Sequence, residues 1–580
     1  MLTLLALLIA APPDLTTAAE RSKLTRTGRY EEVVTLCRDY PLKYPGKVVC
    51  QPFGTTPEGR PMLSLVASDD GVFEPAAAKA RKRPVIVVQG GIHAGEIDGK
   101  DAGFMALRSF LDGKDAPGVL SKVTWVFVPV FNVDGHERFG PNNRPNQRGP
   151  IEMGWRTTAQ NYNLNRDYAK ADSPEMQAMI RLLVRWDPVV YLDLHVTDGA
   201  DFQHDISILI DPSDAGADPL KTLGKGLRDG VVAKLAKQGN KPVIFYPSFE
   251  VDDDPASGFA IGLPPPRFAQ GYWAARDRIS ILVETHSWKT YAVRVEATRR
   301  AVIAVAEQAR EHAAEWRAAA DAADQMKRGG TTHVLAWQNS KHVQTIDFLG
   351  YEYKRVPSPV SGRLRVIYDP TKPTVWKVPL LDELIPRVTI TAPKAGYYLP
   401  AQATLVAERL ALHGFRIARL AKDEERTVEV HRATEIAFGP KSYEGHQPLT
   451  VKTGAWKAEK VRLPAGTLWI SVDQPAARLL LHLLEPGTPD AFLAWGFFNN
   501  FYEEKEYMEA YVAEAWAETL LARDPTVRQE FAARLASDAA FAADPAARLD
   551  FFYARHPSWD PAYNRYPVMR ADEAPSSLTP

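Results

Sequence analysis

The stretch Pro84–Glu96, PVIVVQGGIHAGE, decides the fold of this sequence. Val85 to Val88 form a short apolar run rich in β-branched residues, which is typical of a strand buried on both faces. Gly90 and Gly91 permit a tight backbone turn, and His93 and Glu96 follow directly. In a sheet rich in parallel strands, groups just past the strand ends lie in the crevice where such folds bind ligands. The stretch therefore predicts a strand that leads into a site.

Three other runs have the same texture and are separated by segments with helical spacing. The runs are Val123–Val130, Val189–Leu194 and Ile279–Glu284, and the helical segments are Lys100–Leu111 and Ser173–Trp186. Ser173 and Pro174 suit the N-cap and first position of the second helix. This alternation predicts an α/β fold with a mixed, largely parallel sheet flanked by helices.

Two of these runs also end in residues that carry chemistry. His195 directly follows Leu194, and Glu284 is the last residue of its run. With His93 and Glu96, they bring two imidazoles and two carboxylates to one edge of the sheet. Two histidines and one glutamate, with a fourth position left to water, are a catalytic zinc set. Bound zinc polarises a carbonyl and acidifies its water, and a further carboxylate is needed to take the proton. We expect one zinc ion per chain, with Glu284 as the base.

Weaker signals are explained more simply by structure. The chain holds a second His-x-x-Glu, His312 to Glu315, on a charged helix away from any strand end, and we expect it to be solvated. No HExxH or GxSxG motif is present. Arg181 and Arg185 lie four apart on a predicted helix and are most simply surface residues.

The constellation as a whole resembles the zinc carboxypeptidases of the carboxypeptidase A type, over roughly residues 28–325. The resemblance implies a bacterial-type secreted member with a long C-terminal extension, in which His93, Glu96 and His195 hold zinc and Glu284 promotes the water. It also implies that an Asn-Arg pair, here Asn165 and Arg166, grips the C-terminal carboxylate of the substrate. Arginine suits that role because its planar fork binds a carboxylate in a bidentate manner.

A further arginine of the family polarises the scissile carbonyl. Arg144, Arg148 and Arg156 all precede the Asn-Arg pair, and the spacing favours Arg156; the other two are expected to be solvated loop residues. Asn163 stands where the family commonly has an aspartate that orients a zinc-binding histidine. An amide can still accept from an imidazole N–H but brings no negative charge. The tyrosine that caps the substrate stays open between Tyr246 and Tyr272.

Composition limits the partners. The 580 residues include 70 basic and 71 acidic ones, a net charge of −1, which argues against nucleic acid or an anionic membrane as the main partner. Leu2–Ala11 is almost wholly apolar, too short to span a bilayer but suited to a signal peptide at residues 1–19. A periplasmic or secreted protein without a stable membrane span is expected. Cys37 and Cys50 either pair or are two separately buried thiols.

The rest of the chain predicts a second region. Glu296–Met326 is an alanine-rich helix that ends before Gly329 and Gly330. We place a zinc carboxypeptidase-like catalytic domain at residues 20–330 and a mixed α/β accessory region of unknown role at residues 331–580. Strand-like stretches dominate the first part of that region, and residues 503–556 are mostly helical.

The expected function is a zinc-dependent carboxypeptidase acting on peptides with a free C-terminal carboxylate. One alternative shares the scaffold but is an amidohydrolase that acts on acylated amino acids or cell-wall peptides. The other alternative is a non-catalytic peptide-binding module, which would have no need of Glu284 beside a complete ligand set.

Overall fold

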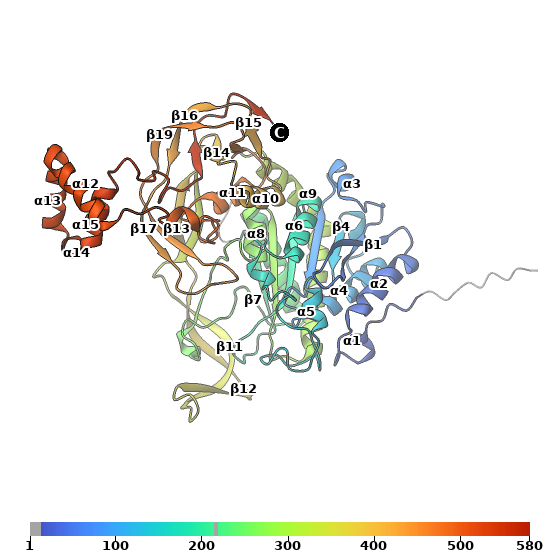
Figure 1. The fold of residues 1–580 in the computed structure, drawn as a ribbon. Helices are drawn as coiled ribbons and strands as arrows, with labels where there is room; N and C mark the ends of the chain where they lie inside the picture. Colours follow the sequence, from blue (N-terminus) through green and yellow to red (C-terminus); the bar gives the residue numbers. More distant parts are fainter. Residues whose placement is uncertain (1–12, 214–217, 580) are drawn as a thin grey trace, which may run out of the picture.

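A computed structural model describes residues 13–213 and 218–579 of the chain. Its centre is an eight-stranded sheet with the order β1-β2-β4-β3-β5-β9-β6-β7 (Figure 1). The strands are β1 (Val48–Thr55), β2 (Pro61–Ala67), β3 (Val85–Gly90), β4 (Thr124–Val128), β5 (Val190–Val196), β6 (Ile206–Asp211), β7 (Pro242–Val243) and β9 (Ile279–Thr285).

The middle of this sheet is parallel, and antiparallel pairs flank it on both sides. Strands β4, β3, β5 and β9 are neighbours that run in the same direction. Strands β1, β2 and β4 pair antiparallel, as do β9 and β6. The predicted mixed, largely parallel sheet is confirmed. The carboxyl ends of β3, β5 and β9 consequently lie at one edge of the sheet, where the residues of the predicted site follow.

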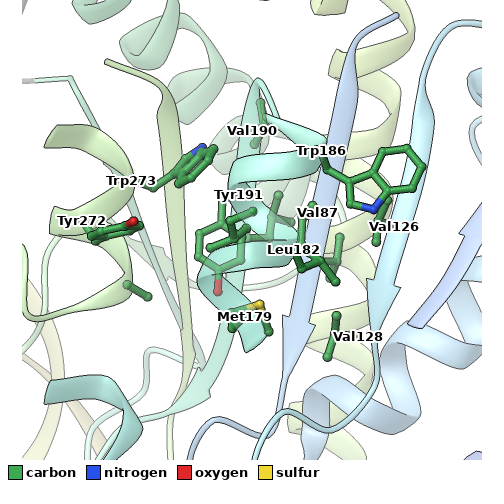
Figure 2. Packing of buried hydrophobic residues seen from close by; sticks show 14 of the residues in the cluster. Val87, Val126, Val128, Met179, Leu182, Trp186, Val190, Tyr191, Tyr272 and Trp273 are labelled. Carbon is green, nitrogen blue, oxygen red and sulfur yellow. The ribbon is translucent and has the colours of Figure 1, made fainter. Parts of the chain in front are cut away.

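Helices cover both faces of the sheet because successive strand residues point to opposite sides. Helices α6 (Pro174–Trp186) and α8 (Ala269–Ala275) pack on the face that carries Val87, Val126 and Tyr191, as Figure 2 shows. On the other face, Phe104 of α4 (Asp98–Leu111) meets Phe127, with ring centroids 5.3 Å apart. Helix α9 (Tyr291–Asp324) packs beside α4, and α7 (Asp218–Lys237) packs beside α9. Both faces of the parallel strands are thus buried.

The helix limits agree closely with the sequence patterns. Ser173 caps α6 by accepting a hydrogen bond from the Met176 N–H, as its position before Pro174 predicted. Helix α9 begins five residues earlier than predicted, because the Thr290 side chain accepts from Val293 N and caps it there. Apolar spacing alone does not locate such a capping residue.

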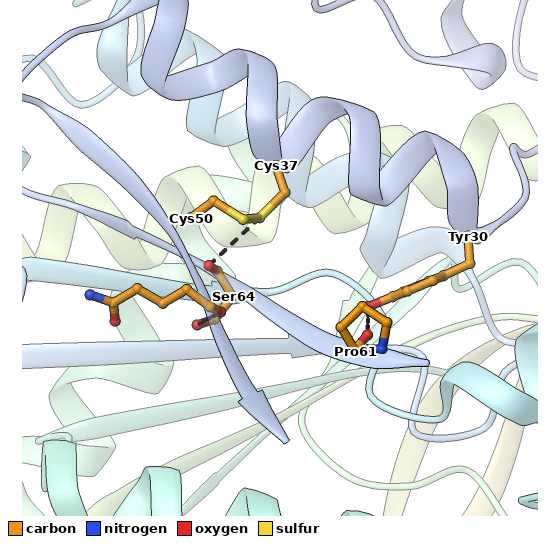
Figure 3. The surroundings of a disulfide bond; sticks show 6 residues. Tyr30, Cys37, Cys50, Pro61 and Ser64 are labelled. Atoms are coloured by element: carbon orange, nitrogen blue, oxygen red, sulfur yellow. Dashed lines mark hydrogen bonds between the residues drawn. A yellow bond between two sulfur atoms is a disulfide. The ribbon is translucent and has the colours of Figure 1, made fainter. Parts of the chain in front are cut away.

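A disulfide joins Cys37 to Cys50, which settles the two alternatives for these cysteines (Figure 3). It ties α2 (Tyr30–Lys43) to β1, the edge strand of the sheet. In the same helix, the Tyr30 hydroxyl donates to the Pro61 carbonyl oxygen at 2.7 Å. The edge strand is therefore held by a covalent link and covered by a helix.

Most of the predicted signal segment, residues 1–12, lies outside the described residues. Helix α1 (Ala18–Arg21) follows, with Thr17 and Glu20 forming a capping box. Leu15 and Ala19 are buried, and Glu20 pairs with Arg108 of α4. The small residues before position 20 are thus part of the packed fold. Across residues 13–213 and 218–579, no helix has the length and apolar character needed to cross a membrane.

The C-terminal region is rich in strands and carries four helices between residues 510 and 553, as predicted. Its largest sheet has seven strands in the order β19-β16-β21-β14-β20-β15-β22. Its elements are β10 (Thr332–Asn339), β11 (Gln344–Pro357), β12 (Leu364–Leu381), β13 (Leu384–Thr391), β14 (Gly396–Leu399), α10 (Thr404–Leu412), β15 (Ala418–Leu420), β16 (Glu424–Val430), β17 (Ala433–Phe438), β18 (Leu449–Thr453), β19 (Lys457–Leu463), β20 (Leu468–Ser471), α11 (Ala477–Leu484), α12 (Ala510–Arg523), α13 (Pro525–Ser537), α14 (Ala539–Ala543), α15 (Pro545–Tyr553), β21 (Met569–Ala571) and β22 (Leu578–Thr579).

One hairpin of this region reaches back to the N-terminal part of the chain. Strands β11 and β12 form the long hairpin, and β12 adds to β8 (Phe259–Ala260) in parallel, with Leu380 opposite Phe259. Around this junction lies an aromatic cluster of residues from both parts of the chain. Phe245, Phe259, Phe348 and Trp376 are among its buried members. The two regions therefore share a hydrophobic core.

Candidate active site

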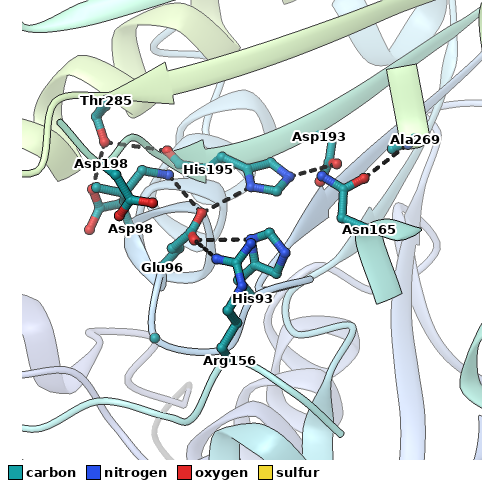
Figure 4. A network of polar contacts seen from close by, with 12 residues as sticks. His93, Glu96, Asp98, Arg156, Asn165, Asp193, His195, Asp198, Ala269 and Thr285 are labelled. Atoms are coloured by element: carbon teal, nitrogen blue, oxygen red, sulfur yellow. Dashed lines mark hydrogen bonds and ion pairs between the residues drawn. The ribbon is translucent and has the colours of Figure 1, made fainter. Parts of the chain in front are cut away.

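His93, Glu96 and His195 lie together where β3 and β5 end, as Figure 4 shows. One ligand atom from each of the three falls within 4.8 Å of the others, and all three side chains are buried. Gly95 lets Arg144 and Gly154 pack closely against this segment, because an added Cβ would lie 2.5 Å from Arg144 Cγ and 2.8 Å from the Gly154 oxygen. The strand ends thus bring together the three residues that the sequence singles out.

The two histidines present the same ring nitrogen to Glu96. Nδ1 of His93 lies 3.0 Å from Glu96 Oε1, and Nδ1 of His195 lies 2.9 Å from Oε2. Behind them, His93 Nε2 lies 3.0 Å from Asn163 Oδ1, and His195 Nε2 lies 2.7 Å from Asp193 Oδ2. Both of these oxygens only accept, so each Nε2 carries the proton and donates it.

This arrangement fits a metal ion. With the proton on Nε2, the Nδ1 of a neutral imidazole has a free lone pair that faces a carboxylate oxygen of Glu96. Both of these atoms are acceptors, so a proton or a cation is needed between them. Burial lowers the pKa of His93 to about 4, despite the opposing charge of Glu96, so His93 is neutral at pH 7. Neutral imidazole and ionised carboxylate are the forms that bind metals. The three residues form a group able to hold one ion.

Neighbouring charges shift the pKa values of Glu96 and His195 and favour the charged form of each. Burial alone would raise the pKa of Glu96, but Arg144 and the two histidines outweigh it and lower that pKa well below its usual value. Burial would likewise lower the pKa of His195, but Asp193 and Glu96 hold it well above the usual value. Proton and metal therefore compete for the same position on His195.

Asp193 is a site residue that the sequence reasoning missed. It lies on β5 two residues before His195, and alternate residues of a strand share a face. That spacing was a usable signal. Asp193 gives His195 a charged hydrogen-bond acceptor, whereas His93 has the neutral amide of Asn163.

Of the three loop arginines, two come to the site. Arg156 is about one third exposed, and its Nη1 lies 3.3 Å from Glu96 Oε1. Arg144 was expected to be solvated, and that expectation is wrong: it is buried and pairs with Glu96 at 2.9 Å and Asp198 at 3.2 Å. Arg148 is half exposed, with its guanidinium 5.3 Å from the centre of the Trp288 ring. Arg144 belongs to the site because its loop folds across Gly95, which the local sequence does not reveal.

Glu284 stands beside His195 on the neighbouring strand. The two residues are partners in the register of β5 and β9. Glu284 is 6% exposed, and its Oε2 has no hydrogen-bond partner among the described residues. Burial raises the pKa of Glu284 above its usual value, and Glu96 adds to this, whereas His195 opposes it. A bound cation would act with His195 and favour the ionised form. Glu284 is thus a carboxylate with an open acceptor beside the metal-binding group.

Asn165 and Arg166 line the same cavity as these residues. Asn165 Oδ1 accepts from Ala269 N at 3.0 Å, which fixes the orientation of its amide. The Arg166 guanidinium lies 4.2 Å from the centre of the Phe268 ring, and its Nη1 donates to the backbone carbonyl oxygen of Asn165 at 2.8 Å. Arg166 forms no ion pair with any described residue. A positioned cation without a counterion is suited to bind an anionic group.

The cavity has a volume of about 550 Å³ and decides between the two candidate tyrosines. Tyr246 lines it, and burial followed by the charges of Glu284 and Asp198 raises the pKa of its hydroxyl. Tyr272 lies in the core, fully buried, where its hydroxyl is 2.9 Å from His413 Nδ1. Only Tyr246 is placed to meet a ligand in the cavity.

The second His-x-x-Glu is a surface pair, as expected. His312 and Glu315 lie on α9 with their side chains 43% and 63% exposed and 3.5 Å apart. No third ligand accompanies them in the part of the chain that the structure describes. The strand-end context, and not the motif itself, distinguishes the two copies.

Comparison with known proteins finds similarity to carboxypeptidases. A family model described as zinc carboxypeptidase matches residues 33–205. Carboxypeptidase 2 of Trichophyton tonsurans is 23% identical over 457 residues, which are 76% of this chain and 78% of that protein. An inactive metallocarboxypeptidase of Schizosaccharomyces pombe is 38% identical over 102 residues, 16% of this chain and 19% of that one. Among solved structures, carboxypeptidase A of Helicoverpa armigera covers 53% of this chain and 80% of its own, with 16% identity and a TM-score of 0.37.

Residues 33–205 of the α/β region, which include His93, Glu96 and His195, thus match the model of a zinc carboxypeptidase family, whose members use zinc. The chain is accordingly a hydrolase of the metallocarboxypeptidase type, and it provides a His-Glu-His group able to bind the metal.

Proposed function

We propose that this protein is a zinc-dependent carboxypeptidase that removes the C-terminal residue of peptides. In this proposal His93, Glu96 and His195 hold one zinc ion, Glu284 is the general base, and Asn165 and Arg166 bind the C-terminal carboxylate. The observation that carries the proposal is the unpaired cation of Arg166 in the same cavity as the metal-binding group and Glu284. Such a pairing of sites suits a substrate whose scissile bond lies next to a free carboxylate.

Each of these residues has a distinct role in the proposed hydrolysis. Zinc at this position would polarise the scissile carbonyl and make water more acidic. Glu284 accepts one proton of the attacking water and passes it to the leaving nitrogen as the C–N bond breaks, which yields a carboxylate and an amine. Arg156 lies on the cavity wall beside Glu96, where it can stabilise negative charge on the carbonyl oxygen. Tyr246 lines the same cavity, where its ring and hydroxyl can contact the substrate.

Matched peptides with a free acid or an amide at the C-terminus test the role of Arg166. A carboxylate that leaves water for a buried site needs a matched cation. A charged hydrogen bond contributes roughly 1.5–3 kcal/mol, so we expect kcat/KM for the amide to be about 10–100-fold lower. Arg166→Ala should lower kcat/KM for the acid by a similar factor and leave the amide little changed.

The same assay includes a control variant and distinguishes the competing functions. Arg148→Ala removes an exposed arginine that does not line the cavity and should preserve the preference for the acid. If the wild-type protein cleaves acid and amide equally well, it is no carboxypeptidase, whatever its zinc content. An amidohydrolase would prefer acylated amino acids or cell-wall peptides in a parallel panel. A binding module would take up zinc and peptide without turnover.

We also propose that residues 20–330 form the catalytic domain and that residues 331–580 support one wall of its cleft. Phe245 and Tyr246 line the cavity, and Phe245 lies in the aromatic cluster with Phe348 and Trp376 of the β11–β12 hairpin. The ring of Trp376 stacks on Phe348 with centroids 5.7 Å apart. The accessory region is thereby positioned to control the shape of the substrate-binding wall.

Trp376→Ala tests this role of the hairpin. Removing a buried tryptophan costs about 3–5 kcal/mol of packing, here in the cluster behind Tyr246. We expect a KM about tenfold higher, with an unchanged zinc content, because the wall shifts while the metal ligands do not. Phe541→Ala is the matched control, since Phe541 is equally buried in the separate cluster of α12–α15. Equal effects of both substitutions on KM would contradict the proposal.

The site of action is part of the proposal. The apolar Leu2–Ala11 segment suits export, and the disulfide between Cys37 and Cys50 suits an oxidising compartment. We propose a periplasmic or secreted enzyme.

A further inference from the structure

A second cavity lies between the α/β region and the C-terminal region. It has a volume of about 310 Å³ and is bounded by α8 on one side and by β10, β13 and α11 on the other. Asp211 and the segment 263–265 line both this cavity and the first one, so the two are neighbours with a common wall. None of the metal-binding residues borders the second cavity.

Two guanidinium groups in its wall have no counterion among the residues that the structure describes. Arg478 of α11 donates a single long hydrogen bond, from Nη2 to the Val334 oxygen at 3.4 Å, and forms no ion pair with a described residue. Arg387, exposed at the rim, forms neither hydrogen bonds nor ion pairs within residues 13–213 and 218–579. By contrast, Arg267, which also lines the cavity, pairs with Asp490 at 2.7 Å.

The position of Arg478 is costly unless something else binds it. Burial lowers the pKa of Arg478, although the charges of Asp277 and Asp211 oppose this shift. Arg478 is half-buried, and a cation that is partly removed from water without a paired anion is unfavourable, because arginine stays protonated at all ordinary pH values. Asp211, the acidic residue of the wall, already accepts from Gln270 Nε2 at 2.6 Å. The wall therefore carries more positive than negative charge and offers donors that await acceptors.

Most of the remaining wall, apart from His482, is apolar and limits the kind of ligand. Proline, leucine and alanine side chains from both regions face the cavity: Pro212, Leu263, Pro264, Pro265, Ala274, Ala275, Leu335, Ala336 and Pro489. The volume is at the small end of the range of ligand pockets. We propose that this cavity is a second binding site, distinct from the metal-binding cavity, for a small carboxylate with an apolar body. Its carboxylate would bind between Arg478 and Arg387, because a guanidinium fork matches a carboxylate.

The site also has a direct connection to the first cavity. Pro264 and Pro265 begin the segment that continues into Phe268 and Ala269. Phe268 supports the guanidinium of Arg166, and Ala269 N donates to Asn165. A ligand in the second cavity would therefore contact the same short segment that positions the proposed carboxylate-binding pair.

Calorimetric titration of the full chain with hexanoate tests the proposal. The Arg166→Ala protein is used, so that carboxylate binding in the first cavity is removed and no turnover is needed. We expect one site with a Kd on the order of 1 mM, and binding of the neutral hexanamide at least about tenfold weaker. Arg478→Met and Arg387→Ala should each weaken hexanoate by about tenfold or more. Arg363→Ala, which removes an exposed arginine of the β11–β12 hairpin, should have no effect.

The possible results separate this proposal from the proposed function. Arg387 is exposed, so its substitution cannot act through unfolding, and thermal unfolding checks Arg478→Met. Hexanoate binding that is unaffected by both substitutions would overturn the site. Inorganic phosphate binding as tightly as hexanoate would overturn the ligand class, because phosphate has no apolar body. Since the measurement needs neither zinc nor hydrolysis, it stands even if the carboxypeptidase assignment fails.

Discussion

Glu284→Gln is expected to lower kcat by about 10²–10⁴-fold and to leave the zinc content unchanged. Glutamine keeps the size of the side chain and its hydrogen-bonding capacity but cannot take a proton from water. Glu284 has an Oε2 without a hydrogen-bond partner among the described residues, and it lies beside the His-Glu-His group without being part of it. We therefore expect the substitution to reduce turnover without loss of the metal. The measurement is kcat on a free-acid peptide together with zinc analysis of the purified protein.

A matched substitution shows whether the effect is specific. Glu315→Gln changes the glutamate of the second His-x-x-Glu, which is exposed on α9 and lies apart from the cavity. That variant should keep the turnover of the wild-type protein. A Glu284→Gln protein that also turns over normally would show that another group takes the proton. Loss of folding stability in place of turnover would assign Glu284 a structural role.

The sequence is sufficient to predict the parallel strands of the central sheet and the meeting of four site residues. Continuous β-branched runs identify β3, β5 and β9, and parallel strands place their carboxyl ends at one edge. His93, His195 and Glu284 therefore meet, although the chain separates them by long stretches. Burial on both faces leaves few alternative structures for such runs, and each run itself defines where its strand ends.

The contacts made by irregular segments could not be predicted from the sequence. Arg144 comes from a loop, and only the packing of that loop over Gly95 brings its guanidinium to Glu96. Likewise, no local pattern shows that β12 pairs with β8, because the two strands are far apart in the chain and the pairing is short. Periodicity describes what an element buries but not which distant loop covers it.

His195→Ala is expected to abolish both tight zinc retention and hydrolysis. The substitution removes one of three ligands and leaves Glu96 with a single imidazole partner, His93. Zinc sites in catalysts keep three protein ligands, so two are too few for stable binding. The measurement is zinc per chain after dialysis against a chelator, with activity recorded on the same samples. His312→Ala, at the exposed second motif, is the control and should retain both zinc and activity.

The hydrogen bonds behind the ligands allow a graded version of the same experiment. Asp193→Asn keeps an acceptor for His195 Nε2 but removes its negative charge, so zinc affinity should fall by about 10–100-fold. Asn163→Asp adds a charge behind His93 and should change zinc affinity in the opposite direction. Charge behind an imidazole strengthens its Nδ1 lone pair as a ligand, and in both cases the hydrogen bond itself is kept. Full zinc occupancy in His195→Ala would refute the ligand assignment. That result would hold whatever the graded variants show, because a hydrogen-bond partner of His195 can tune zinc affinity only if His195 binds the metal.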